Sequence, residues 1–333
     1  MRAYVFPGQG VQKKGMGRGV FEHFPELCRQ ADEVLGYSVE RLCLKDPERQ
    51  LNKTEYSQPA IYVVNALHYL MACRQELPAT DYLAGHSLGE YNALFAAGAF
   101  DFETGVTLVK RRAELMAKAD GGGMAAVVGV SSNVIEETLK AHDVVGVVIA
   151  NYNAPEQFVL SGSKEELERI EPIFESMKCV RGFVPLRVSG AFHSPSMAPV
   201  AKAFRAFLDS VDFGEVVTPV ISSVTGRPFE SGQQAVRETL AEQVTQPVRW
   251  AECIRYMQNA GVSVFVELGE SKVLTSLIDK ITAEEQGASK AEPTDAVPWR
   301  EYHDERVLAL LRDCANGTLS VDKVIETIRA GAQ

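Results

Sequence analysis

Residues 81–97 run without interruption from a strand through a sharp turn into a helix. Asp81–Ala84 is a short apolar strand, Gly85–Gly89 reads Gly-His-Ser-Leu-Gly, and Glu90–Ala97 has the pattern of a helix. Glycines on either side let a serine occupy a crowded, strained turn with its hydroxyl exposed, so G-x-S-x-G in this setting is typical of a nucleophile elbow. A chain with this segment needs a strand and a helix packed directly on each other.

Strands and helices alternate on both sides of this elbow and of a central stretch that follows it. Ala3–Phe6 is an expected strand, and later strands at Val217–Ser222 and Val262–Glu267 alternate with helices at Gln233–Gln243 and Arg249–Ala260. This alternation predicts an α/β fold, with a parallel sheet covered by helices on both faces as in an α/β-hydrolase-like domain.

The central stretch, residues 121–189, has a different pattern. Its order β-α-β-β-α-β is that of a ferredoxin-like unit; the expected elements are Met124–Val130, Asn133–His142, Val145–Asn151, Gln157–Ser161, Lys164–Met177 and Gly182–Val188. We therefore expect residues 1–120 and 190–283 to form a large catalytic domain and residues 121–189 to form an inserted small domain.

Two further regions complete the predicted organisation. Phe21 to Leu77 has helical spacing, with breaks expected at Asp32, Pro47 and Thr54–Pro59. Residues 284–333 begin with a linker-like composition and end in two short helical patterns, so we expect a linker and a helical tail.

Composition excludes several classes of function. The charge of −10 repels nucleic-acid phosphates and anionic lipid. No signal-peptide pattern or run of ~18 apolar residues is present, which favours a cytoplasmic protein. The six cysteines and six histidines are scattered without zinc-ligand spacing, so we expect reduced, mostly buried thiols and no metal site.

Ser87 is the candidate nucleophile. A helix beginning at Leu88 directs a backbone N–H and the positive end of its dipole toward Ser87, as a developing oxyanion requires. A catalytic serine needs a base, and the leading candidate is His193. It lies in the turn-like segment Gly190–Pro195, which reads Gly-Ala-Phe-His-Ser-Pro. An ordinary loop histidine with no catalytic role fits this pattern equally well. His86 adjoins Ser87 but is expected on the other side of the turn.

Arg112 lies in the basic run Lys110–Arg112 on the helix after the elbow helix. Such a run is usually a solvated helix face. A guanidinium could also bind a carboxylate with two parallel hydrogen bonds, and the residue pattern alone does not choose between these interpretations.

Four motifs in order give the chain a resemblance to a known family: Phe6–Gly10 (Phe-Pro-Gly-Gln-Gly), Gly85–Tyr91, Gly190–Pro195 and Pro247–Trp250 (Pro-Val-Arg-Trp). Together they resemble the malonyl-CoA:acyl-carrier-protein transacylases, over almost all of residues 1–281. Between the motifs, Tyr91–Gly105 is more similar to the free-standing acyltransferases that serve polyketide synthases.

The resemblance implies a role for each motif residue. Ser87 would carry malonyl as an ester, His193 would be the general base and acid, and the N–H groups of Gln9 and Leu88 would form the oxyanion hole. A backbone carbonyl just before Pro247, which we assign to Gln246, would orient His193.

Substrate contacts follow from the same resemblance. Arg112 would bind the malonyl carboxylate, Phe192 would narrow the space beside the α-carbon, and His86 would adjoin the substrate. The expected reaction is ping-pong malonyl transfer to a carrier protein, such as a domain of a polyketide synthase, by a monomer that needs no cofactor beyond the coenzyme A thioester. Lys13, Lys14 and Arg18, beside the Gln9 turn, are candidates for docking an acidic carrier.

Three alternatives remain at this point. An acyl hydrolase that edits carrier-bound thioesters would use the same Ser87 and His193. An ordinary α/β-hydrolase esterase would have the order Ser, Asp, His, which only His303 satisfies. A carrier-binding module with an inactive site would not need Ser87, His193 and Arg112 together.

Overall fold

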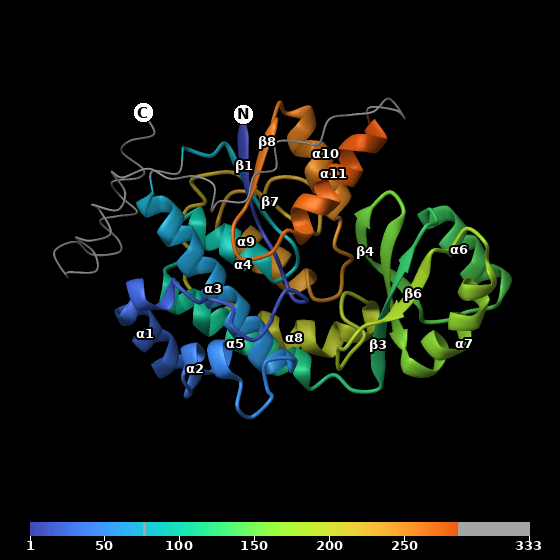
Figure 1. The fold of residues 1–333 in the computed structure, drawn as a ribbon, viewed down its shortest axis with the longest axis horizontal. Coiled ribbons are helices and arrows are strands. Elements are labelled where there is room, and N and C mark those ends of the chain that lie inside the picture. Colours follow the sequence, from blue (N-terminus) through green and yellow to red (C-terminus); the bar gives the residue numbers. More distant parts are fainter. Residues whose placement is uncertain (76–77, 286–333) are drawn as a thin grey trace.

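The computed structural model describes residues 1–75 and 78–285, which form two sheets with helices packed around them (Figure 1). The first sheet is parallel, in the order β7-β2-β1-β8, and the second is antiparallel, in the order β4-β5-β3-β6. The predicted α/β class, with a parallel sheet and a separate antiparallel sheet, is confirmed. The strands are β1 (Arg2–Phe6), β2 (Tyr82–Gly85), β3 (Gly122–Val128), β4 (Val148–Ala154), β5 (Gln157–Ser163), β6 (Gly182–Pro185), β7 (Val220–Ile221) and β8 (Val264–Glu267).

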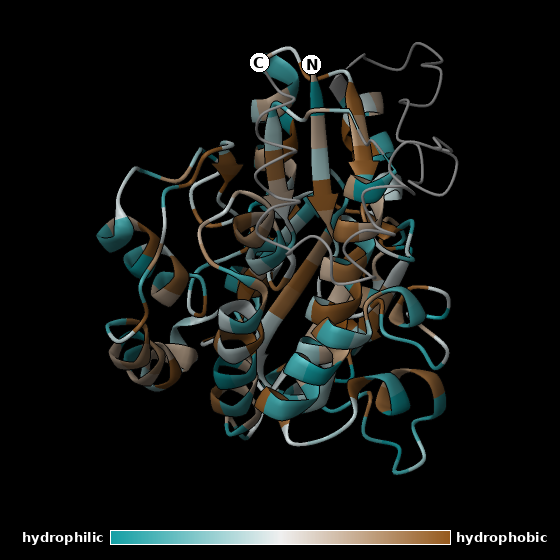
Figure 2. Cartoon of the chain, turned by 90° about the vertical axis from the view of Figure 1, so that its left-hand side faces the viewer, coloured by the Kyte–Doolittle hydropathy of each residue, from teal (hydrophilic) through white to brown (hydrophobic). Residues whose placement is uncertain are grey.

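Helices pack on both faces of the parallel sheet and on one face of the antiparallel sheet. They are α1 (Pro25–Leu35), α2 (Val39–Lys45), α3 (Thr54–Arg74), α4 (Gly89–Ala96), α5 (Phe102–Ala117), α6 (Ser132–Ala141), α7 (Lys164–Ser176), α8 (Ala198–Leu208), α9 (Gln233–Glu242), α10 (Trp250–Asn259) and α11 (Val273–Glu285), with short 3₁₀ turns at Phe21–His23 and Pro195–Met197. Figure 2 shows teal and brown residues alternating around many of them, as expected for helices with one face on the core. No helix in the described ranges is long and apolar enough to span a bilayer.

The parallel sheet separates two hydrophobic cores. Tyr4 and Phe6 of β1 belong to the core shared with α3, α4 and α5, whereas Ala3 and Val5 belong to the core shared with α10 and α11. This alternation is the period-two pattern of a strand covered on both faces. β1 and β2 are in parallel register, with Phe6 opposite Gly85, so the turns after both strands emerge at the same edge.

The antiparallel sheet is covered by helices on one face only. Its strand order is the one expected of a ferredoxin-like unit, and Ala125 and Val127 of β3 pack with α6 and α7. Met124 and Val159 face the other way and join the core of the parallel-sheet region. This uncovered face is therefore turned toward the rest of the molecule.

Two of the predicted helix breaks were wrong. Asp32 lies inside α1, where its carboxylate accepts the Val39 N–H and so caps the start of α2. Pro59 lies inside α3, whose residues are buried along nearly the whole helix. Tertiary packing outweighs the cost of a proline in such a helix. The structure also ends β6 at Pro185, before the predicted Val188, and reduces the strand expected at residues 217–222 to β7.

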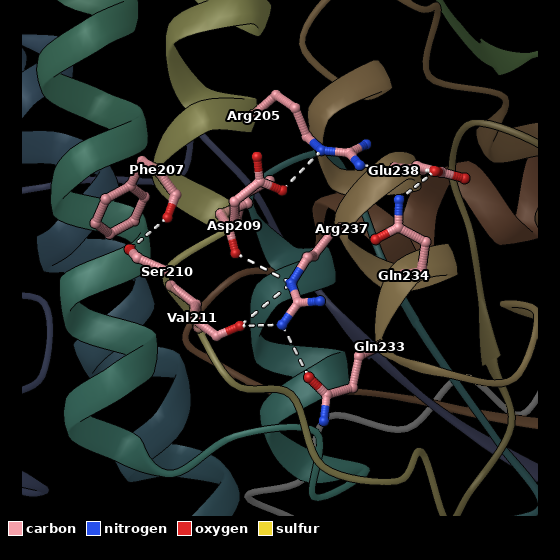
Figure 3. Close-up of polar contacts among 10 residues, drawn as sticks. Arg205, Phe207, Asp209, Ser210, Val211, Gln233, Gln234, Arg237 and Glu238 are labelled. Carbon is pink, nitrogen blue, oxygen red and sulfur yellow. Dashed lines mark hydrogen bonds and ion pairs between the residues drawn. The ribbon is translucent and has the colours of Figure 1, made fainter.

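Polar contacts fasten α9 to the end of α8 (Figure 3). The Arg237 guanidinium on α9 donates to the carbonyl of Val211, which follows α8, at 2.7 Å, and Arg205 on α8 pairs with Glu238 on α9 at 3.6 Å. α8 follows the His193 segment and α9 ends at Glu242, directly before Gln243. These contacts therefore hold together the two segments that meet at the candidate site.

The tail prediction cannot be compared with the fold, because residues 286–333 lie outside the described part of the chain. His303 and Cys314 belong to that region. Of the other cysteines, Cys28, Cys43, Cys73 and Cys253 are buried free thiols and Cys179 is exposed.

Candidate active site

Ser87 stands on a tight turn between β2 and α4. Its φ of 51° places it in the left-handed region, which non-glycine residues seldom occupy. The turn is closely packed, since a Cβ on Gly85 would lie 2.0 Å from the Gly89 carbonyl carbon, and one on Gly89 would lie 2.0 Å from the Phe6 oxygen. Only glycine fits at these two positions, so the strained serine is held by its surroundings.

His193 is hydrogen-bonded to Ser87. The distance between Ser87 Oγ and His193 Nε2 is 2.8 Å, and His193 also has a positive φ, 58°. Its Nδ1 lies 2.8 Å from the Gln243 carbonyl and 3.1 Å from the Gln246 carbonyl. Carbonyl oxygens only accept, so Nδ1 carries the proton and Nε2 can accept the proton of Ser87.

Two backbone carbonyls therefore orient His193. The carbonyl of Gln246, which was predicted from the sequence, makes the longer contact with Nδ1, and the carbonyl of Gln243 makes the shorter one. A backbone carbonyl has no side-chain signature, so no sequence motif pointed to Gln243.

Arg112 on α5 is buried, with 1% of its surface exposed. Its guanidinium makes three hydrogen bonds to neutral oxygens: Gln58 Oε1 at 2.7 Å, Gln243 Oε1 at 3.1 Å and Ser87 Oγ at 3.2 Å. The interpretation of Arg112 as part of a solvated face is thereby excluded. A buried cation whose partners are neutral is poised to bind an anion beside Ser87.

The turn after β1 lies against the elbow. A Cβ on Gly8 would be 2.3 Å from the His86 oxygen and 3.5 Å from the Leu88 nitrogen. Among the backbone hydrogen bonds of residues 1–75 and 78–285, none uses the N–H of Gln9 or of Leu88. Both predicted oxyanion donors thus remain available near Ser87, and Leu88 precedes the first turn of α4.

A cavity of about 450 Å³ opens in front of Ser87, a size suited to a small ligand. The parallel-sheet region contributes its floor, including Gln9, Arg112 and His193. The uncovered face of the antiparallel sheet and the segment that follows β6 contribute a wall, formed by Ala126, Asn151, Asn153, Gln157, Val159, Leu186, Arg187 and Val188.

The two remaining predicted substrate contacts also line this cavity. Phe192 is buried next to His193. His86 is held by Asn153, with Nε2 2.7 Å from Asn153 Oδ1, which joins the elbow to the wall.

The proposed carrier-docking residues lie elsewhere. Lys13, Lys14 and Arg18 are exposed, and none of them lines the cavity. Lys13 lies 4.0 Å from Glu270. Arg187 is the exposed cation that does line it, and the sequence did not single it out.

Burial adjusts the ionisation of the site. Burial, together with the positive charge of Arg112, lowers the pKa of His193 to about 3. His193 is therefore neutral at physiological pH, as a general base must be. Burial also lowers the pKa of Arg112, which remains a cation because guanidinium pKa values start so high.

This arrangement supports serine acyl chemistry on an acyl group that carries a carboxylate. It has a nucleophile, a neutral base within hydrogen-bond distance, two backbone donors and a buried cation on one cavity. The esterase alternative required His303 as the base, whereas the structure places His193 at hydrogen-bond distance from Ser87 Oγ.

Comparisons with known proteins agree with this chemistry. Residues 3–317 match the acyl transferase domain family. The chain is 49% identical over 288 residues to the polyketide biosynthesis malonyl CoA-acyl carrier protein transacylase BaeC of Bacillus velezensis, covering 86% of this chain and 99% of BaeC. It is 48% identical over 298 residues to the polyketide biosynthesis protein PksE of Bacillus subtilis, covering 90% of this chain but only 38% of PksE.

A solved structure of a malonyl CoA-acyl carrier protein transacylase from Burkholderia pseudomallei has a TM-score of 0.82 at 48% identity. It aligns over 87% of this chain and 99% of its own. From the family match, the identities and the shared fold, we conclude that the chain belongs to the acyl transferase family that includes the malonyl-CoA:acyl-carrier-protein transacylases.

Proposed function

We propose that the chain transfers a malonyl group from malonyl-CoA to the phosphopantetheine thiol of an acyl carrier protein in a ping-pong reaction. The observation that carries the proposal is the position of Ser87 Oγ, 2.8 Å from His193 Nε2 and 3.2 Å from Arg112 Nη2. The nucleophile is thus between a base and a carboxylate-binding cation.

Loading begins when His193 Nε2 accepts the Ser87 proton and Oγ attacks the thioester carbon. The N–H groups of Gln9 and Leu88 stabilise the negative oxygen that develops. The carbon–sulfur bond then breaks, and His193 returns the proton to the sulfur of coenzyme A, leaving malonyl as an ester on Ser87.

Transfer is the same sequence in reverse with a different thiol. The thiol of the carrier gives its proton to His193 and attacks the ester, and the Ser87 oxygen leaves with that proton. Gln243 and Gln246 keep Nδ1 protonated throughout by accepting from it.

Arg112 selects the donor in this proposal. A guanidinium holds both oxygens of a carboxylate in one plane, so malonyl is bound in the position that brings its thioester to Ser87. Phe192 limits the space beside the malonyl α-carbon. Hydrolytic editing is not favoured, because a general acyl hydrolase gains nothing from a buried carboxylate-binding cation.

The setting of the reaction belongs to the proposal as well. The relatives named for polyketide biosynthesis support an acyl carrier protein of a polyketide synthase as the acceptor. We propose that the chain acts in the cytoplasm as a monomer, since each step above uses residues of one chain, and that it needs no cofactor, the coenzyme A thioester being its substrate.

The test is intact-protein mass spectrometry after incubation with malonyl-CoA. Wild type should gain one malonyl group, mapped to Ser87 by peptide analysis, and Ser87→Ala should gain none. A stable malonyl adduct on Ser87→Ala would overturn the assignment of the nucleophile.

A further inference from the structure

Glu90 is a buried carboxyl group that the transfer steps above do not use. It lies in the first turn of α4, three residues after Ser87, and none of its surface is exposed. An acidic residue at a helix start is commonly solvated and interacts with the helix dipole. Complete burial next to a catalytic serine calls for another explanation.

Its contacts lead to Arg112 through a single side chain. Glu90 Oε2 accepts the Ser223 N–H at 2.5 Å, and Oε1 accepts Gln243 Nε2 at 2.9 Å. The same Gln243 amide accepts from Arg112 Nη2 with its Oε1 at 3.1 Å, and Nε2 also donates to the Ser87 carbonyl at 3.1 Å.

The Gln243 amide can satisfy these partners in one orientation only. Arg112 has donors alone, and a carboxylate has acceptors alone, so the amide oxygen must face Arg112 and the amide nitrogen must face Glu90. The Gln243 side chain therefore connects a buried negative group with the buried cation of the site.

We propose that Glu90 is a positioning residue for malonyl recognition, which acts through Gln243 on Arg112 and takes up a proton when a carboxylate binds to Arg112. This inference rests on the proposed function. Ionised Glu90 balances the charge of Arg112 in the free enzyme. When Glu90 is protonated, the malonyl carboxylate balances that charge instead.

The reason is charge balance in a buried site. A malonyl carboxylate on Arg112 places a second negative charge close to Glu90, and two nearby carboxylates raise each other's pKa. Burial already raises the pKa of Glu90 to about 7 in the free enzyme, against the opposing effect of its hydrogen bonds and of Arg112. Proton uptake on malonyl binding is thus accessible near neutral pH.

No other titratable group near Glu90 in the described residues would take up this proton near neutral pH when malonyl binds. Burial raises the pKa of Tyr91 and of Cys253 on α10, and that of His193 is about 3. The other elements packed on α4 present neutral groups there, namely Asn65 and the Tyr62 carbonyl from α3, Phe6 from β1 and Gly85 from β2.

The test is the pH dependence of selectivity, measured as kcat/KM for malonyl-CoA divided by kcat/KM for acetyl-CoA. The two donors share the thioester and the coenzyme A phosphates, so pH effects on these groups cancel. In wild type the ratio should be constant below about pH 6 and should fall by up to tenfold per pH unit above about pH 7, the limit for uptake of one proton. In Glu90→Gln, which cannot ionise, the ratio should not vary with pH.

Glu267→Gln is the matched control. Glu267 is also buried and accepts a backbone N–H, from Thr275 at 2.8 Å, but it makes no hydrogen bond to Gln243 or Arg112 in the described residues. This variant should keep the wild-type slope. A flat ratio in wild type, or a wild-type slope in Glu90→Gln, would overturn the inference.

A measurement on wild type alone covers the case in which Glu90→Gln does not fold. Calorimetry of Ser87 loading at pH 7.5, in buffers of different ionisation enthalpy, should show greater proton uptake with malonyl-CoA than with acetyl-CoA. Equal uptake would contradict the role of Glu90. If malonyl never appears on Ser87, the proposed function fails instead, and mass spectrometry distinguishes the two cases.

Discussion

The two sheets contribute differently to the same cavity. The parallel sheet brings two strand ends together, and its turns and helices hold Ser87, His193 and Arg112 through a buried hydrogen-bond network. The antiparallel sheet and the segment after β6 face the cavity with neutral side chains such as Asn153, Val159 and Leu186, and with the exposed Arg187.

The parallel-sheet region thus holds the reacting groups, and the antiparallel sheet shapes the cavity in which they react. Carboxyl ends of parallel strands concentrate helix N-termini and turns at one edge, where strained residues and backbone donors can be held rigidly. An antiparallel sheet with one face uncovered supplies a wall whose side chains can vary without disturbing the reacting groups. We therefore expect large effects from changes in the parallel-sheet region and smaller effects at the wall and the rim.

The largest effect after loss of Ser87 should come from His193. His193→Ala removes the only base in contact with Ser87 Oγ in the described structure, so acyl transfer should slow by roughly 10²–10⁴-fold. His303→Ala should be nearly silent. Steady-state acyl-transfer rates of the two variants test this prediction. A large loss in His303→Ala with little loss in His193→Ala would favour an esterase-type arrangement.

Arg112 should show the next largest effect, confined to donors with a carboxylate. Arg112→Ala should lose about 2–5 kcal/mol of transition-state stabilisation for malonyl-CoA, the cost of removing one partner of a buried charge pair. Acetyl-CoA should lose much less, since it offers no carboxylate to the Arg112 guanidinium.

Arg112→Lys should resemble Arg112→Ala more than wild type, because a point charge cannot hold both carboxylate oxygens. The measured quantity is the ratio of specificity constants for malonyl-CoA and acetyl-CoA. An unchanged ratio in both variants would mean that donor selection resides in the wall after all.

The Ser87 elbow could be predicted from sequence because it is local. Gly85 and Gly89 flank the serine within one strand-turn-helix segment, and the close approaches that require them arise inside that segment and the adjoining β1 turn. The alternating strands and helices likewise predicted both sheets from short-range patterns.

Gln243 and Glu90 could not be found in this way. Gln243 contributes a backbone carbonyl and an amide that connect three distant segments, and Glu90 resembles an ordinary acidic residue of a first helical turn. Their roles depend on contacts between residues 50 to 156 positions apart, which no local pattern encodes. The misplaced break at Pro59 has a related cause, since the burial of α3 is a tertiary property.

The smallest effects should come from the exposed cations. Charge reversal of Lys13, Lys14 and Arg18 should raise the KM for the carrier several-fold, leave malonyl-CoA hydrolysis without carrier unchanged, and weaken with added salt. Arg187→Glu is the contrasting variant, because Arg187 lines the cavity. It should raise the KM for both substrates, which share the phosphopantetheine arm. Equal effects of the triple variant on both substrates would place those three residues in coenzyme A binding or loop folding.

The most direct test of acyl transfer follows the malonyl group from Ser87 to the carrier thiol. Malonyl-enzyme is prepared with isotope-labelled malonyl-CoA, freed of coenzyme A, and mixed with a phosphopantetheinylated carrier or with buffer alone, and the label is followed by intact-protein mass spectrometry. We expect the label to leave Ser87 and appear on the carrier thiol much faster than it is lost to water. Release of free malonate at the same rate with and without carrier would contradict it.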